Sequence, residues 1–174
     1  MTWQSAAGII QPFSSVMSGL LKLFNSRFDA IDLRSVELLS RLPEDRLFWK
    51  PDAVETDGEP HSCGELIIRS AAAIEQTFGG ITRRLWDDPF EWTLPEELAD
   101  KDRIAAYLNE VTAARINGFA FFKDEAELSR QIPAPDSLKT IAEILLETVD
   151  RSSHLQGRAY GIAQQFVRLR PYLA

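Results

Sequence analysis

The sequence contains little cysteine and little histidine. Cys63 is the only cysteine, so the chain forms no disulfide within itself and offers no cysteine cluster for zinc. His61 and His154 are the two histidines, too few for a site that needs three imidazoles. We therefore expect a protein of a reducing compartment whose fold is closed by its hydrophobic core.

Long apolar runs are missing as well. No stretch of about 18 consecutive apolar residues occurs, which argues against a transmembrane helix. The first residues, MTWQSAAGIIQPFSS, have neither the basic region nor the continuous apolar region of a secretory signal. We expect a cytoplasmic protein without a membrane partner.

Basic residues are outnumbered by acidic ones. The chain has 19 Lys and Arg against 26 Asp and Glu, which gives a net charge of −7. Nucleic-acid binding relies on a basic surface that releases counterions from the phosphates. A nucleic-acid partner is therefore not expected.

The size and the apolar content of the chain suit one domain. At 174 residues and 45% hydrophobic composition, a single core can close without disulfides or metal. We assign one domain to residues 1–174, with residues 1–12 as an extension ahead of the first helix.

Four segments repeat apolar residues at helical spacing. They are residues 13–42, 62 to about 81, 101–123 and 140–166. Ser62 with Glu65, and Thr140 with Glu143, have the spacing of capping boxes that start a helix. No segment has a convincing strand pattern, so the sequence predicts an all-α four-helix bundle. The connections are long, and at least one can cross over instead of making a tight hairpin.

One charged residue falls inside an apolar stripe. On the third predicted helix, Arg115 aligns with the apolar residues at about 100° per residue. The methylene groups of Arg115 can pack in the core while its guanidinium reaches solvent or an acidic partner. Alternatively, the guanidinium is a polar group that the bundle holds in its interior.

Three stretches together resemble the DinB/YfiT-like family of four-helix bundle proteins. They are LSRLPEDRLFWKPD, SCGELIIRSAAAIE and ETVDRSSHLQGR, and their order and spacing match over most of the chain. The resemblance implies a bundle, often dimeric, that holds nickel or zinc with three histidines. One histidine comes from the second helix and two from an H-x-x-x-H pair in the fourth. Some family members use this site for metal-dependent thiol transfer or hydrolysis.

The three ligand positions that this resemblance implies hold other residues here. Arg69 stands at the position in the second helix, and Arg151 and Leu155 stand at the pair in the fourth. His154 is a weak substitute, because it lies about 140° from the centre of the apolar stripe. Asp150 and His154 have ligand-like spacing but point away from the core, which favours a surface pair. We therefore expect no metal and no other cofactor.

Two interpretations of the altered site remain open. The candidate pocket consists of the former ligand positions and nearby charged residues, namely Arg69, Arg151, Leu155, Arg115, Glu65 and Glu147. Arginine has no lone pair for a cation, so the arginines favour a small anionic ligand or an internal pair with Glu65 or Glu147. On either reading the chain is a binding or interaction protein, and the replaced ligand positions favour this over an enzyme without deciding it.

Other functions are kept as alternatives. One is a metal-dependent thiol transferase or hydrolase that works through an altered nickel or zinc site. Another is a structural module whose apolar helix faces form a homodimer. Cys63 begins the second helix, where core packing is favoured over a reactive thiol.

Overall fold

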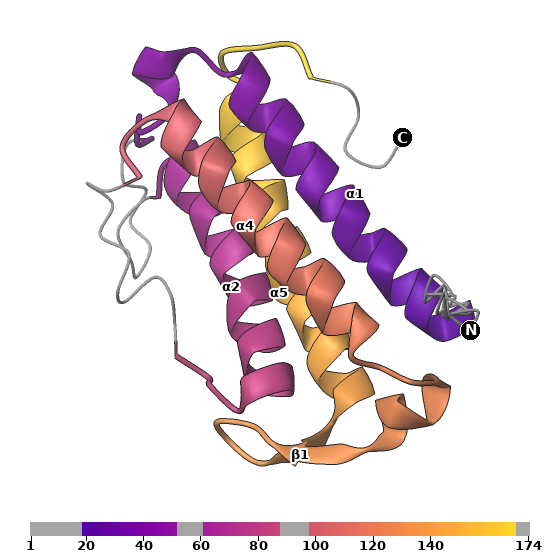
Figure 1. Ribbon diagram of the computed structural model, residues 1–174. Helices are drawn as coiled ribbons and strands as arrows, with labels where there is room; N and C mark the ends of the chain where they lie inside the picture. The colour runs from indigo at the N-terminus through magenta and orange to yellow at the C-terminus, as the bar shows by residue number, and fades with distance from the viewer. Residues whose placement is uncertain (1–18, 52–60, 88–97, 170–174) are drawn as a thin grey trace, which may run out of the picture.

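The computed structural model describes residues 19–51, 61–87 and 98–169. Its long elements are four helices: α1 (Gly19–Arg41), α2 (Cys63–Arg83), α4 (Lys101–Ala120) and α5 (Ile141–Ala163). They pack side by side as one bundle (Figure 1). The all-α four-helix bundle predicted from the sequence is confirmed. No helix in the described ranges is both long and apolar enough to span a membrane.

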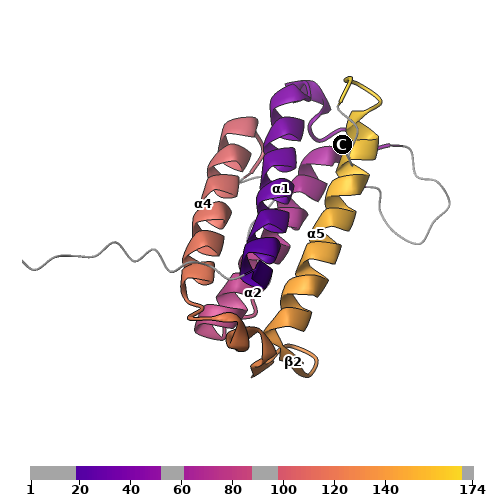
Figure 2. The ribbon, with the colours of Figure 1, turned by 90° about the vertical axis from the view of Figure 1, so that its right-hand side faces the viewer.

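The helices run in two directions along the bundle. In Figure 1, α1 and α5 run upward through the bundle, whereas α2 and α4 run downward. α2 and α4 run the same way although they follow each other among the long helices. The crossover expected from the long connections therefore lies between α2 and α4. Figure 2 shows α4 and α5 on opposite sides of α1.

Three aromatic rings join three of the helices at the centre of the core. Phe28 of α1, Phe78 of α2 and Phe119 of α4 are at most 3% exposed. Their ring centroids lie 5.7 Å, 6.0 Å and 5.2 Å apart in tilted or edge-on arrangements. Such geometry is favoured by the ring quadrupoles and adds to the burial of area.

The contact between α2 and α5 is close and contains hydroxyl groups. The Ser70 hydroxyl donates to the Ser152 carbonyl at 3.0 Å, and the Ser152 hydroxyl donates to the Ser70 carbonyl at 3.1 Å. Further along, the Thr77 and Thr148 hydroxyls lie 2.7 Å apart. Small side chains allow this approach, and every buried hydroxyl named here has a partner, as burial in a low dielectric requires.

The contact between α1 and α5 contains a buried amide. Gln156 is 0% exposed, and its Nε2 donates to the Ile31 carbonyl and, at 2.9 Å, to the Ser35 hydroxyl. An amide bound to backbone on a neighbouring helix fixes the register of the two helices, because any slip would leave buried donors unpaired.

Both predicted capping boxes are present. The Ser62 hydroxyl accepts from the Glu65 amide while Glu65 accepts from the Ser62 amide, and Thr140 and Glu143 repeat this arrangement at α5. α2 ends at Arg83, and the next residue, Arg84, has φ 62°, the left-handed conformation common after a helix.

Several boundaries differ from the sequence expectations. The sequence analysis missed two strands, β1 (Gln131–Pro133) and β2 (Leu138–Thr140), which pair antiparallel between α4 and α5. Each is three residues long, too short for an alternating pattern to show. The last helix ends at Ala163, not 166, and the expected helical residues 13–18 lie outside the described ranges. Two short 3₁₀ turns, η1 (Glu44–Arg46) and η2 (Glu125–Ser129), occupy the connections.

Candidate functional site

The residues at the three positions where the family resemblance implies metal ligands do not fit a divalent metal. Arg69 is half-buried on α2, Arg151 is exposed on α5, and Leu155 packs against the core. Guanidinium and hydrocarbon groups have no lone pair to donate. Within the described ranges, no group of three His, Cys, Asp or Glu side chains is placed to hold a metal ion. His154 is exposed, on the solvent side, as the helical wheel predicted.

Arg151 is tied to the end of α2 through one glutamine. Its Nη1 lies 3.5 Å from the Gln76 Oε1, and the Gln76 Nε2 donates to the Trp86 carbonyl at 2.9 Å. The Trp86 indole in turn donates to the Pro133 carbonyl at 3.0 Å. Arg151 therefore lies along the side of α2, within reach of solvent.

A second group of basic side chains surrounds His61 at the start of α2. Burial lowers the pKa of His61, and the charges of Arg69, Arg158 and Lys50 lower it further, opposed only in part by Glu65. Like charges disfavour the protonated imidazole, so Arg69, Arg158 and Lys50 act on the ring in the same direction as its burial. Arg151 lies two turns before Arg158 on the same side of α5, and we call Lys50, His61, Arg69, Arg151 and Arg158 the basic face.

The two glutamates of the candidate pocket bind lysines. Glu65 lies 3.1 Å from Lys50 and 4.0 Å from His61, and its carboxylate also caps α2. Glu147 is exposed and pairs with Lys139 at 2.8 Å. Partners for Arg69 and Arg151 were expected at these acids. The geometry instead directs Glu65 to the helix start and Glu147 to strand β2.

Arg115 lies in a different place from the other arginines. It is 1% exposed and bridges from α4 to α1, with Nη2 2.5 Å from Asp29 and 3.0 Å from Asp32. Its Nη1 donates to the Asn25 side chain. The buried, paired arginine matches its position in the apolar stripe, but its partners belong to α1 and not to the basic face.

Asp32 is the carboxylate in this contact whose charged form is destabilised by burial. Burial raises its pKa, although the charge of Arg115 and hydrogen bonds from Thr112 and Arg115 act in the opposite direction. Removing a carboxylate from water is expensive, and the nearby guanidinium offsets only part of that cost. The cluster therefore acts as a structural connection between α1 and α4.

Cys63 is a core residue, as the sequence indicated. It is 0% exposed, and burial raises the pKa of its thiol to about 12. The thiolate is the reactive form of cysteine, and it is negligibly populated at neutral pH with such a pKa. The start of α2 therefore does not activate this residue.

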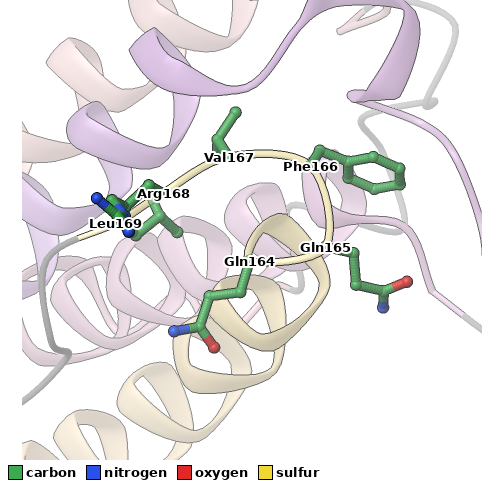
Figure 3. Close-up of a pocket in the computed structure, with 6 residues that line it drawn as sticks. All are labelled: Gln164, Gln165, Phe166, Val167, Arg168 and Leu169. Carbon is green, nitrogen blue, oxygen red and sulfur yellow. The ribbon is translucent and has the colours of Figure 1, made fainter.

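A shallow hollow of about 430 Å³ follows the end of α5. It is lined by consecutive residues of one turn, 164–169, and Figure 3 shows their side chains spreading outward in different directions. The Phe166 ring lies edge-on to Trp49 at 5.0 Å and beneath the Arg46 guanidinium at 5.3 Å. Those contacts anchor the turn to the bundle.

Sequence reasoning missed Lys50 and Arg158 as members of the basic face. Arg158 follows Arg151 by seven residues, which places both on one side of α5, so helical spacing contained a signal for it. Lys50 precedes α2 across residues 52–60, which are not described, and no periodicity links it to Arg69.

Comparison with solved structures supports the fold. The chain superposes on the crystal structure of a DinB-like protein from Bacillus subtilis with a TM-score of 0.65 and 18% sequence identity. The match covers 86% of this chain and 96% of the other. No family model matches the sequence. The curated proteins provide no match either. The four-helix arrangement is thus DinB-like.

Proposed function

We propose that this DinB-like bundle is a metal-free binding protein whose basic face takes a small anionic ligand. The observation that carries the proposal is the group of cations at the start of α2. Lys50 and His61 both lie beside Glu65, and the charges of Arg69 and Arg158 contribute to the lowered pKa of His61. The whole chain has a net charge of −7, so a local concentration of cations runs against its overall balance. A positive site on an otherwise acidic protein is suited to bind a carboxylate or a phosphate.

The chemistry of arginine supports an anion over a metal. Arg69 and Arg151 stand where the resembled family keeps histidine ligands, and each replacement adds a permanent positive charge. A guanidinium binds carboxylate and phosphate oxygens through two parallel hydrogen bonds. Glu65 is the acid within the group, and it is already engaged by the Ser62 amide and Lys50.

Binding of inorganic phosphate and of citrate at low ionic strength tests the proposal. Exposed charges are screened within about 10 Å at 0.1 M salt, so low salt is needed. We expect saturable stabilisation in a thermal shift assay, equivalent to about 2.7 kcal/mol at a ligand concentration 100 times the Kd. Isothermal titration calorimetry then gives the affinity directly.

Matched variants separate a site from general charge attraction. Arg69→Gln and Arg158→Gln each remove one cation of the basic face, and we expect each to weaken binding about tenfold or more, since charged hydrogen bonds contribute about 1.5–3 kcal/mol. Arg27→Gln removes the same charge from an exposed position on α1 and is expected to bind as the parent does. Equal weakening in all three variants would contradict a defined site.

The metal content of the purified protein tests the competing enzyme hypothesis. We expect elemental analysis of protein prepared without a histidine tag to find no stoichiometric metal, because the basic face repels a divalent cation. Nickel, zinc or iron at one equivalent per chain would overturn the proposal in favour of an altered catalytic site.

A further inference from the structure

A cleft of about 360 Å³ lies between the parallel helices α2 and α4. Its lining comes from both helices and comprises Glu75, Phe78, Gly79, Thr82, Arg83, Ala114, Asn117, Gly118 and Phe121. None of these residues belongs to the basic face. The volume falls in the range of small-molecule sites, about 300–1,000 Å³.

Two glycines of the lining are packed closely against neighbouring groups. A Cβ added at Gly118 would lie 2.3 Å from a ring carbon of Phe78, so only glycine permits this approach of α4 to α2. Gly79 is similarly confined, because an added Cβ would lie 3.1 Å from the Leu85 carbonyl. The ring of Phe78 forms the floor, and the exposed Phe121 stands at the edge.

The cleft carries opposite charges toward its two ends. Glu75 lies near one end, where its Oε2 accepts from the Tyr107 hydroxyl at 2.7 Å. Within the ranges that the structure describes, Glu75 Oε1 has no hydrogen-bond partner. Arg83 lies in the last turn of α2, eight residues further along, which corresponds to about 12 Å of helix. At that separation the two charges cannot satisfy each other.

We propose that this cleft binds a linear zwitterion with an amine at one end, a carboxylate at the other and an apolar middle. The ammonium group is held by Glu75, whose carboxylate is kept in position by Tyr107. The carboxylate lies by Arg83, and the apolar middle packs between Phe78 and Phe121. Asn117 at the rim offers an amide to any polar atom along the chain of the ligand.

A series of ω-amino acids of increasing length tests the separation of the two charged ends of the cleft. ω-Aminobutyrate is too short to reach both charges, whereas ω-aminooctanoate is long enough. Titration into ¹⁵N-labelled full-length protein is followed by the amide signals of Gly79 and Gly118. We expect saturable shifts with ω-aminooctanoate, and apparent affinity at least tenfold weaker for ω-aminobutyrate, for the N-acetylated probe and for the C-terminal amide.

Variants locate the two ends of the ligand. Glu75→Gln retains an oxygen for Tyr107 but loses the charge, and it is expected to bind the amine and N-acetylated probes equally weakly. Arg83→Gln is expected to remove the preference for the free carboxylate. Glu110→Gln, at an exposed position elsewhere on α4, is the charge control and is expected to behave as the parent. Ala114→Leu fills the cleft and is expected to abolish the shifts.

Three results would overturn the proposal. One is the absence of shifts at Gly79 and Gly118, another is shifts of equal size with the blocked probes, and the third is full affinity in Glu75→Gln. Because the cleft and the basic face share no residue, these outcomes leave the anion proposal untouched.

Discussion

At the scale of single residues, Arg115 shows how one side chain connects two helices. It is the largest of the fully buried side chains and pairs with Asp29 and Asp32 of α1. Its Nε has no hydrogen-bond partner in the described structure, so even this contact is incompletely satisfied. A buried charge that is well paired is costly to break but not always favourable to keep.

Replacing Arg115 with methionine is expected to destabilise the bundle by about 3–5 kcal/mol, because Asp32 is then buried without a counter-charge. Urea denaturation measures this change. The double variant Arg115→Met with Asp32→Asn is expected to recover a substantial part of the loss, since the uncompensated carboxylate is gone. A double variant no more stable than the single one would show that packing, and not charge, dominates at this position.

At the scale of the elements, the helix starts are the parts that the sequence specified best. Ser62 with Glu65 and Thr140 with Glu143 have a local spacing, and both boxes form. The strands β1 and β2 could not be found in the same way, because three-residue strands have no period. The partners of Arg115 were equally hidden, because they depend on how α1 packs on α4.

The same limit of sequence-based prediction applies to the basic face. The sequence identified Arg69 and Arg151 through the resemblance, but it could not show which acids they meet. Glu65 and Glu147 are each one helical turn from an arginine in sequence, yet each binds a lysine from a different element. Side-chain rotamers and the fold of the connections decide such pairings.

The capping box of α2 makes stability depend on pH. Burial on its own would raise the pKa of Glu65, but hydrogen bonds from Ser62 and Lys50 and the Lys50 charge leave that pKa below the ordinary glutamate value of 4.5. A lowered folded-state pKa contributes stability above 4.5 that is lost as the pH falls through the folded value. We expect urea denaturation at pH 7 to show that the parent is more stable than Glu65→Gln. The difference in the free energy of unfolding is expected to shrink at acidic pH. A difference independent of pH would contradict this role.

Replacing a glycine with alanine is expected to change the stability of the protein in opposite directions in α5 and in α2. At Gly161 of α5 an added Cβ meets nothing within 4 Å, whereas at Gly80 of α2 it would lie 2.3 Å from the Trp86 indole. Gly161→Ala is expected to stabilise the protein by about 0.5–1 kcal/mol through helix propensity. Gly80→Ala is expected to destabilise it by about 1–3 kcal/mol through overpacking. Thermal unfolding of the pair provides the comparison, and equal effects would refute the close approach of Trp86.

At the scale of the whole molecule, the homodimer suggested by the sequence stays a prediction. α1 exposes large apolar side chains along its length, at Leu20, Leu23, Leu33 and Val36. Light scattering coupled to size exclusion is expected to give twice the chain mass of 19.6 kDa. Leu33→Glu, which changes the most exposed of these positions, is expected to shift the dimer toward monomer, with Leu146→Glu on α5 as the control. A monomer at all concentrations would contradict the prediction.

The central proposal is that the basic face of this DinB-like bundle binds an anion and not a divalent metal. NMR titration of the two histidine rings tests it most directly, because His61 lies within the site and His154 serves as the control signal. We predict that inorganic phosphate raises the pKa of His61, since a bound anion offsets Arg69, Arg158 and Lys50. We also predict that Arg69→Gln raises it without phosphate. A His61 titration unchanged by phosphate at low ionic strength would contradict the account.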